Sequence, residues 1–305
     1  MIVSATPANI AEAAEIIRRG GLVAFPTETV YGLGANALDA DAVSRIFKAK
    51  ERPFANPLIV HVADEAMARS LVLEWPALAE TLASCFWPGP LTIVLRKAEN
   101  VPDLVTAGLD SVGIRIPAHP VALALIRAAG VPVAAPSANR FTQLSPTAAQ
   151  HVLDGMGERV KLILDGGPTD VGIESTVVSL RRTPPAILRP GMISQRDLES
   201  ATGLTWQCEI EQPRIADAPA ESPGQHPKHY APRTPFHVLD ANAPLPQGPG
   251  KLLEMPSDPD AYASCLYAAL HAADREGWDW IAVRKPPETA EWAGIIDRLK
   301  RASAT

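Results

Sequence analysis

Short apolar stretches with strand periodicity alternate with helical patterns along most of this 305-residue chain. Residues 22–25, 58–62, 91–95 and 111–116 favour strands, and amphipathic helical stretches lie between them. Strands and helices that alternate in this way form a sheet covered by helices. The sequence therefore predicts an α/β fold for the first two-thirds of the chain.

The alternation is interrupted once, which divides the chain into three parts. Residues 1–205 carry the first α/β pattern, and residues 206–235 are rich in proline and poor in periodicity. Residues 236–305 contain a shorter set of strand and helix patterns. The prediction is a large α/β domain, a proline-rich linker and a small second α/β domain.

Capping residues predict where several helices begin. Thr6 precedes Pro7, and Asp41 precedes an apolar helical face. Ser145 precedes Pro146 in the same way. A hydroxyl or carboxylate that accepts a backbone N–H bond is a common N-cap, and proline is favoured at the first helical position. We therefore expect helices to begin at these three places.

Composition excludes several classes of protein. Apolar residues make up 47% of the chain and charged residues 20%, as in globular proteins, and no apolar run is long enough to span a membrane. The net charge of −6 argues against non-specific nucleic-acid binding as the main role. Cys85, Cys208 and Cys265 show neither metal-ligand nor disulfide spacing, and the N-terminus lacks a secretory pattern. A cytoplasmic location is expected.

Residues 24–34 contain the first candidate site. An apolar strand ends at Pro26, and the hydroxyls of Thr27 and Thr29 follow, which strand alternation would place on one side of the backbone. Gly32 and Gly34 come next and permit either a tight turn or the close approach of a ligand. From this stretch alone, a strand followed by a structural glycine turn is as good an interpretation as a site.

The strand at residues 111–116 has one polar face. Ser111, Gly113 and Arg115 alternate with apolar residues, so a hydroxyl, a gap and a guanidinium share one side. This composition suits the wall of a cleft better than a core. Lys50 and Arg52, with Lys48, place three cations within five residues, which predicts either a polyphosphate clamp or a solvated helix face.

Further polar residues lie in loops at strand ends, where α/β domains usually build their sites. Each also has a structural explanation: turn formation, helix capping, a core position or a surface charge. These candidates are Asn56, His61, Ser137, Asn139, Ser145, Ser175 and Arg189. Walker, dinucleotide-glycine, Gly-x-Ser-x-Gly and His-Glu-x-x-His patterns are absent.

Six motifs occur in order and together resemble one family. They are Phe-Pro-Thr-Glu-Thr-Val-Tyr-Gly-Leu-Gly, Lys-Ala-Lys-x-Arg-Pro-x-x-x-Asn-Pro-Leu-Ile-Val-His, Trp-Pro-Gly-Pro-Leu-Thr, Gly-Ile-Arg-Ile-Pro, Ala-Pro-Ser-Ala-Asn and Glu-Ser-Thr-Val-Val. The chain resembles the YrdC-like domain family of threonylcarbamoyl-AMP synthases. Its Ser-Pro-Gly and His-Tyr-Ala-Pro segments and its tail are similar to the longer, two-domain form.

The resemblance implies a twisted mixed-sheet YrdC-like domain with a concave basic cleft, plus a small Rossmann-like C-terminal α/β domain. It implies a nucleotidyltransferase that converts L-threonine, bicarbonate or CO2, and ATP into threonylcarbamoyladenylate and diphosphate. Mg2+ would accompany the ATP, whose phosphates would supply most of its ligands, and no dedicated metal site is expected in the protein. The product would pass to tRNA-modifying transferase proteins for threonylcarbamoyladenosine synthesis. Contact with tRNA is expected to be indirect or weak, and no membrane is involved.

The resemblance also implies roles for single residues. Lys50 and Arg52 would be the catalytic cations that hold phosphates. Threonine would be held by Thr29, His61, Arg115, Ala135 and Ser175. ATP would be held by Arg52, Asn56, Ser111, Ser137, Ser145, Arg189 and Tyr230, the last closing over the nucleotide from the linker.

The chain departs from the family pattern at two places. Glu51 stands where the family often has glycine, and its side chain either points outward or weakens the neighbouring cations. In the linker, Gln225, His226 and Pro227 replace the usual Met-Lys-Tyr, which makes the closing role less secure. The C-terminal domain is also shorter than usual.

Two other interpretations remain open. One is an RNA-binding or ribosome-associated module that uses the same basic surface, against which the acidic net charge and the lack of interleaved aromatic residues argue. The other is the carbamoyl-transfer domain of a hydrogenase-maturation type of enzyme. The zinc-finger and acylphosphatase-like domains that accompany that domain are not found in this sequence.

Overall fold

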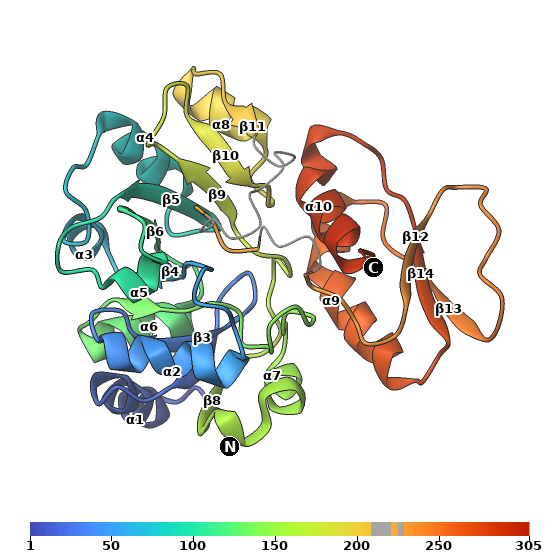
Figure 1. Cartoon of the computed structure of the whole chain (residues 1–305), viewed down its shortest axis with the longest axis horizontal. Coiled ribbons are helices and arrows are strands. Elements are labelled where there is room, and N and C mark those ends of the chain that lie inside the picture. Colours follow the sequence, from blue (N-terminus) through green and yellow to red (C-terminus); the bar gives the residue numbers. More distant parts are fainter. Residues whose placement is uncertain (209–220, 225–228, 305) are drawn as a thin grey trace.

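A large mixed sheet organises the first domain of the computed structural model, which describes residues 1–208, 221–224 and 229–304 (Figure 1). Within those residues the sheet has the order β1-β8-β2-β3-β7-β4-β6-β5-β9-β10-β11. Its strands are β1 (Ile2–Ser4), β2 (Val23–Pro26), β3 (Tyr31–Asn36), β4 (Ile59–His61), β5 (Leu91–Arg96), β6 (Ser111–Arg115), β7 (Val133–Ala134), β8 (Leu162–Asp165), β9 (Thr176–Ser179), β10 (Ala186–Arg189) and β11 (Gln207–Cys208). Parallel and antiparallel pairs both occur, which confirms the predicted mixed α/β fold.

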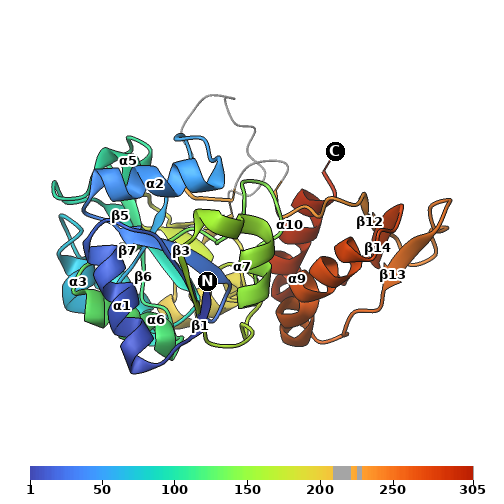
Figure 2. The same cartoon turned by 90° about the horizontal axis from the view of Figure 1, so that it is seen from below.

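Helices cover this sheet on two faces, with α1 and α6 on one side and α2 and α5 on the other (Figure 2). The helices of the first domain are α1 (Pro7–Arg18), α2 (Ala40–Lys50), α3 (Glu65–Arg69), α4 (Ala77–Phe86), α5 (Asp103–Thr106), α6 (Pro120–Ala129), α7 (Ala149–Met156), the 3-10 turn η1 (Gly157–Arg159) and α8 (Gln195–Thr202). Strand β2 shows how the layers form. Val23 and Phe25 pack toward α1 and α6, whereas Ala24 belongs to the core on the opposite face. Successive residues of this central strand therefore pack into the apolar cores on opposite faces of the sheet.

The Gly32–Gly34 segment is a strand, so the predicted glycine turn is wrong. Strand β3 pairs antiparallel with β2 and places Gly34 opposite Val23. A Cβ at Gly34 would lie 2.7 Å from the ring of Phe25 and 2.8 Å from Val133. These glycines therefore serve close packing inside the sheet, and the turn itself lies before them, at residues 27–30.

Two predicted helix starts are also wrong, whereas the first is confirmed. Thr6 caps α1 by accepting a hydrogen bond from the backbone N–H of Asn9. Helix α2 is capped by Asp39 rather than Asp41, because the Asp39 carboxylate accepts the N–H bonds of the first turn. Helix α7 begins at Ala149, after Ser145–Pro146. The carbonyl of Pro146 instead accepts a hydrogen bond from the N–H of Tyr31, which holds that segment extended beside β3.

The second domain is a small parallel sheet with two helices. Strands β12 (Phe236–Leu239), β14 (Trp280–Arg284) and β13 (Gly250–Leu253) lie in that order. Helices α9 (Pro259–Arg275) and α10 (Ala293–Ala302) lie between this sheet and the first domain, and the 3-10 turn η2 (Ala290–Trp292) precedes α10 (Figure 1). The second, smaller α/β domain is thus confirmed. Because β11 pairs with β10, the large sheet reaches beyond residue 205; the division at residues 205 and 235 stays a prediction.

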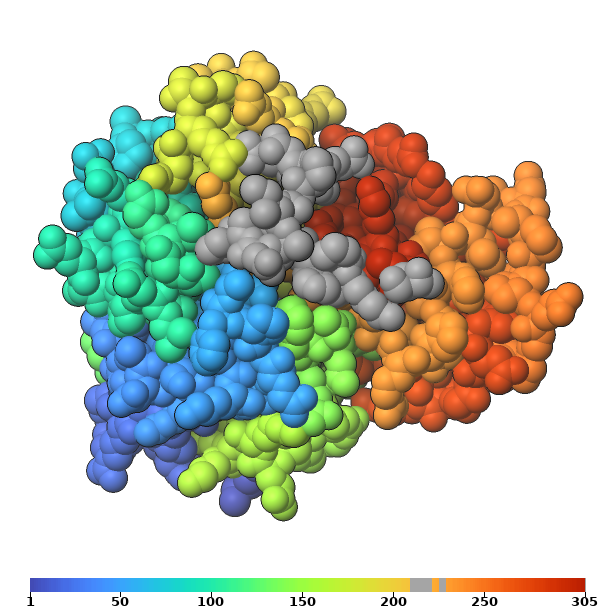
Figure 3. Space-filling model, viewed as in Figure 1, coloured from blue at the N-terminus to red at the C-terminus, as the bar shows by residue number. Residues whose placement is uncertain are grey.

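The two domains share one apolar cluster. Val30, Leu144 and Ile173 of the first domain belong to the same buried cluster as Tyr262 and Leu266 of α9. The backbones also approach closely at glycines: a Cβ at Gly294 would lie 2.7 Å from the carbonyl oxygen of Gly191. The space-filling view shows the second domain, in orange and red, beside the first (Figure 3). Burial of this apolar cluster contributes to the cohesion of the two domains.

Gly294→Ala is expected to destabilise the protein by about 1–3 kcal/mol, because a methyl group would push α10 away from the Gly191 backbone. Gly155→Ala in α7 is the matched control, since nothing lies within 4 Å of a Cβ there. The higher helix propensity of alanine should leave that variant unchanged or stabilise it by up to about 1 kcal/mol. Urea unfolding followed by tryptophan fluorescence measures both. Equal midpoints for the two variants would contradict this account of the interface.

Candidate functional site

One cavity of about 50 Å3 collects residues from distant parts of the first domain and from the linker. Thr29, Arg52, Arg115 and Ser175 all lie on its wall, so residues that the family resemblance assigned to one cleft are close together. The complete lining is Thr27, Thr29, Val30, Gly32, Arg52, Leu58, Ile59, His61, Arg115, Ala135, Pro136, Ser137, Glu174, Ser175, Arg189, Pro223, Gly224, His229 and Tyr230. Sheet order explains the meeting, because β2, β4, β6, β7, β9 and β10 all contribute residues at or next to a strand end.

The turn between β2 and β3 presents two hydroxyls to the cavity. Thr27 Oγ1 accepts hydrogen bonds from the N–H groups of Thr29 and Val30, and it donates to the carbonyl of Val30. The hydroxyls of Thr27 and Thr29 lie 2.8 Å apart. The prediction that they share one side is confirmed, although they do so in a turn rather than in a strand. Thr27 was seen in the sequence but was not assigned to the site.

Arg115 and His61 lie on neighbouring parallel strands, in register with each other. Arg115 donates hydrogen bonds to the carbonyl of Gly89 and to Thr29 Oγ1. Its Nη2 lies 2.7 Å from Glu28 Oε1, but the two atoms are not aligned for a hydrogen bond. Among the described residues, Arg115 Nη2 and His61 Nδ1 are buried without a hydrogen-bond partner. Such buried polar atoms are rare, and ligand binding is one explanation for them.

His61 is held in its neutral form. Burial, reinforced by the positive charge of Arg115, lowers the pKa of His61 to about 3. A neutral imidazole can both donate and accept one hydrogen bond. His61 can therefore contact a polar ligand without adding to the positive charge of the site.

Arg52 and Arg189 supply two further buried cations on the wall. Arg52 donates to the carbonyl of Pro57 at 3.0 Å, and burial lowers its pKa to about 10. Arg189 donates to the carbonyl and the hydroxyl of Ser175, and burial lowers its pKa as well. Both guanidiniums use neutral acceptors here, so much of their charge is available to an anionic ligand.

Four predicted site residues are not on the wall. Asn56 contributes its carbonyl to Arg52, and Ser145 donates its hydroxyl to Glu174. Ser111 is buried at the start of β6, opposite Arg96. Lys50 is buried, and its ammonium donates to the carbonyls of Ser137 and Asn139. The ligand roles of these four residues stay predictions.

The structure decides between the two possibilities for Glu51. This residue ends α2 with a left-handed backbone, φ 55°. Its carboxylate pairs with Arg140 and Arg159, at 2.8 and 2.9 Å, and it is not part of the cavity wall. Glu51 thus points outward and does not neutralise Arg52.

The linker contributes residues that the sequence assigned only in part. Pro223, Gly224, His229 and Tyr230 all lie on the cavity wall, and only Tyr230 was predicted. The altered linker residues 225–227 lie outside the described residues, as do 209–220 and 228. Ligand pockets usually measure about 300–1,000 Å3. The cavity is therefore too small for a nucleotide while these linker residues line it.

Glu174 is another wall residue that the sequence did not assign to the site. It precedes Ser175, lines the cavity and is buried. Burial alone would raise the pKa of Glu174, but the nearby charges of Arg298 and Arg189 outweigh it and hold the pKa below its ordinary value. The one feature of the sequence that could have assigned Glu174 to the site was its position in the Glu-Ser-Thr-Val-Val motif.

The described residues contain no cluster of three or more His, Cys, Asp or Glu side chains that could hold a metal ion. Within the same part of the chain, no helix combines the length and apolar character needed to cross a membrane.

Comparison with protein-family models gives two consecutive matches. Residues 15–191 match the Sua5–YciO–YrdC model, described as "Telomere recombination", and residues 193–304 match "Threonylcarbamoyl-AMP synthase, C-terminal domain". The threonylcarbamoyl-AMP synthase of Pyrococcus abyssi is 41% identical over 95% of this chain and 93% of its own length. The Bacillus subtilis enzyme of that name is 39% identical over 97% of this chain and 93% of its own length.

The chain belongs to the threonylcarbamoyl-AMP synthase family. The crystal structure of P. abyssi Sua5 complexed with L-threonine agrees with this assignment, with a TM-score of 0.92, 38% identity, and coverage of 99% of this chain and 97% of that one. The structure of Escherichia coli YciO is similar over 61% of this chain and 90% of the YciO chain, with a TM-score of 0.54 and 26% identity. The relatives named as synthases support the enzymatic interpretation over the RNA-binding one.

In this family member, His61→Asn is expected to make stability less sensitive to acid. The unfolded chain protonates His61 below a pH of about 6.5, whereas the folded protein keeps it neutral down to a pH of about 3. The unfolding free energy due to His61 therefore falls on acidification within this window, by at most about 1.4 kcal/mol per pH unit. Urea unfolding at pH 7.0, 6.0 and 5.0 should give a shallower pH slope for the variant. Parallel slopes would show that His61 does not titrate in this way.

Proposed function

We propose that this chain synthesises L-threonylcarbamoyladenylate from L-threonine, bicarbonate or CO2, and ATP, with release of diphosphate. The observation that carries the proposal is the meeting of Thr29, Arg52, Arg115 and Ser175 on one cavity wall in a member of this family. The similarity to a relative solved in complex with L-threonine supports threonine as the amino-acid substrate.

The proposed chemistry needs positioning more than acid–base catalysis. The neutral amine of threonine adds to CO2 and loses a proton, which gives a carbamate. A carbamate oxygen then attacks the α-phosphate of ATP, the bond to the β-phosphate breaks, and diphosphate leaves. Reactions of this class are accelerated mainly by alignment and by neutralisation of phosphate charge. A site of arginine, serine and threonine side chains suits that requirement.

The carboxylate of threonine is assigned to Arg115. The Nη2 of this guanidinium is buried, positively charged and without a hydrogen bond among the described residues. A carboxylate would supply the missing acceptor in place of the poorly aligned Glu28. Thr29, His61, Ser175 and the backbone of Ala135 are proposed to complete this half of the site.

The phosphates of ATP are assigned to Arg52 and Arg189, whose guanidiniums are buried on the same wall. Ser137 and Tyr230 are proposed to contact the nucleotide, and Lys50 to fix the loop that carries Ser137 through its hydrogen bonds to the carbonyls of Ser137 and Asn139. Mg2+ is proposed to enter bound to the ATP phosphates, where it would neutralise their charge. The linker residues on the wall would have to move to admit the nucleotide.

The proposal includes the destination of the product. The adenylate would be passed to tRNA-modifying transferase proteins in the cytoplasm, so tRNA would meet this chain only indirectly or weakly. The mixed anhydride between a carbamate and a phosphate is prone to hydrolysis, so transfer close to the site of synthesis would protect it.

Pure protein supplied with threonine, bicarbonate and Mg-ATP is expected to release diphosphate and to form a threonine-containing adenylate. A coupled diphosphate assay and mass spectrometry of the product measure the two outcomes. Serine in place of threonine serves as the control for side-chain selectivity. Diphosphate release that is equally fast without any amino acid would reject the proposed reaction.

Arg115→Ala is expected to weaken threonine binding about 10- to 100-fold and ATP binding less than about threefold. A lost charge-assisted hydrogen bond usually costs about 1.5–3 kcal/mol, and about 1.4 kcal/mol corresponds to a factor of ten. Isothermal titration with each ligand gives both affinities. Arg181→Ala, which removes an exposed arginine paired with Asp110, is the control. Equal losses for both ligands would remove the specific role of Arg115.

A further inference from the structure

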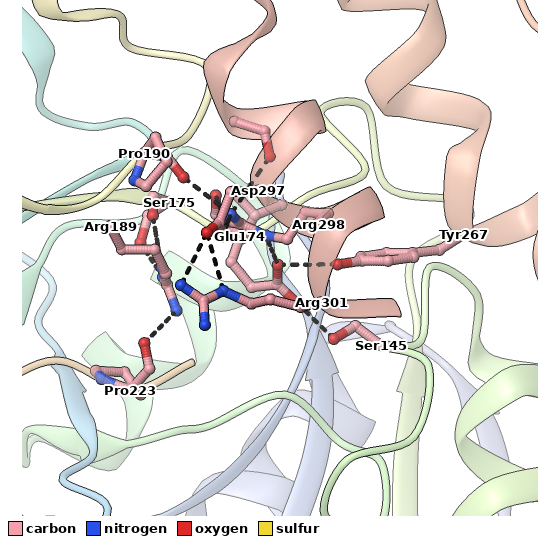
Figure 4. Close-up of polar contacts among 12 residues, drawn as sticks. Ser145, Glu174, Ser175, Arg189, Pro190, Pro223, Tyr267, Asp297, Arg298 and Arg301 are labelled. Carbon is pink, nitrogen blue, oxygen red and sulfur yellow. Dashed lines mark hydrogen bonds and ion pairs between the residues drawn. The ribbon is translucent and has the colours of Figure 1, made fainter. Parts of the chain in front are cut away.

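Arg298 of α10 reaches from the second domain to the back of the cavity wall (Figure 4). Its side chain is completely buried. Nε donates to Glu174 Oε2 at 2.7 Å, and Nη2 donates to the backbone carbonyl of Glu174 at 3.1 Å. A single guanidinium thus fixes both the side chain and the main chain of one wall residue.

The same guanidinium holds a second segment of the wall. Arg298 Nη1 donates to the carbonyl of Pro190 at 2.9 Å and to Asp297 Oδ2 at 2.8 Å. Pro190 follows Arg189, and Glu174 precedes Ser175. Arg189 and Ser175 are themselves joined by three hydrogen bonds across the strands β9 and β10. Arg298 therefore lies behind the two neighbouring residues that are proposed to contact ATP and threonine.

Other contacts bind this cluster to the rest of the site. Glu174 also accepts hydrogen bonds from Ser145 Oγ and from Tyr267 Oη, the latter at 3.1 Å. The guanidinium carbon of Arg298 lies 5.2 Å from the ring centre of Tyr230, which faces the cavity. Every strong donor and acceptor of the Glu174–Arg298 pair thus has a partner, as a preorganised site requires.

This ion pair is one of several contacts between the domains among the described residues. The shared apolar cluster around Val30, Ile173 and Leu266 already joins them. A buried ion pair often contributes little net stability, because removing two charges from water costs about as much as their attraction returns. Such a pair can instead fix one geometry, and here that geometry belongs to the cavity wall.

We propose that Arg298 is a positioning residue of the active site, through which the second domain fixes Glu174, Ser175 and Arg189 for the reaction. The inference rests on the proposed function. Its consequence is that the second domain completes the site, although none of the residues it contributes lies on the cavity wall among those described.

Arg298→Met, which keeps the length of the side chain and removes its charge and donors, is the main test. It should lower kcat/KM for threonine and for ATP at least tenfold at a temperature where circular dichroism shows a folded protein. Threonine affinity from isothermal titration should fall with it, which gives a readout besides activity. Arg298→Lys, which keeps the charge but cannot reach both Glu174 and Pro190, should be intermediate.

Arg275→Met is the matched control. Arg275 of α9 pairs with Asp154 of α7 at 2.8 Å, so it is another interdomain ion pair, but a half-exposed one outside the cavity wall. This variant should keep both kinetic constants within about twofold. The double variant Glu174→Gln with Arg298→Met should have a kcat/KM no lower than that of the less active single variant. Both substitutions disrupt the same ion pair, so their effects should not add.

The outcomes separate the two hypotheses. Wild-type protein without threonine-dependent diphosphate release would reject the proposed function. Active wild type together with unchanged kcat/KM and threonine affinity in folded Arg298→Met would overturn the positioning role and leave a purely structural ion pair. If Arg298→Met does not fold, Arg298→Lys decides: a fall of at least about fivefold in kcat/KM supports the proposal, and no change overturns it.

Discussion

Five buried cations around one small cavity impose the main physical constraint on this structure. Lys50, Arg52, Arg115, Arg189 and Arg298 are all almost completely removed from solvent. Burying charge is costly unless hydrogen bonds compensate for the lost water. Each of the five donates to at least one backbone carbonyl, a neutral acceptor that compensates for part of the lost water. Arg115 and Arg298 also lie against the carboxylates of Glu28 and Glu174, whereas Lys50, Arg52 and Arg189 donate to neutral acceptors. The scaffold therefore holds concentrated positive charge that suits a polyphosphate and a carboxylate.

Two buried carboxylates, Glu174 and Glu28, line or adjoin the cavity and differ in their hydrogen bonds. Glu174 is buried and fully engaged by Ser145, Tyr267 and Arg298, whereas Glu28 faces Arg115 without a well-formed hydrogen bond. The first carboxylate thus acts as a fixed part of the scaffold. The Glu28 carboxylate lies against Arg115 without completing the hydrogen bond of Nη2. The two carboxylates therefore differ in how fully hydrogen bonds fix them.

Local patterns predicted most of the elements and the residue types of the site, but not every contact. Strand β4 and the polar face of β6 were evident from alternation, so the positions of His61 and Arg115 followed. Strand β3 was missed because its glycines usually indicate a turn, whereas here close packing against Phe25 and Val133 explains Gly34. Ser145 has the sequence of an N-cap, yet a hydrogen bond from β3 to Pro146 keeps the chain extended there.

By itself, the sequence determined the α/β architecture, the family and most of the side chains on which the proposed function depends. Periodicity and motif spacing encode these properties locally. Only the tertiary structure decided that Glu51 points outward, that Lys50 binds carbonyls, and that Arg298 meets Glu174 from 124 positions away. The physical reason is that such contacts depend on how the β-sheet and the domain interface bring distant segments together. A local sequence pattern carries no information about which distant residues become neighbours.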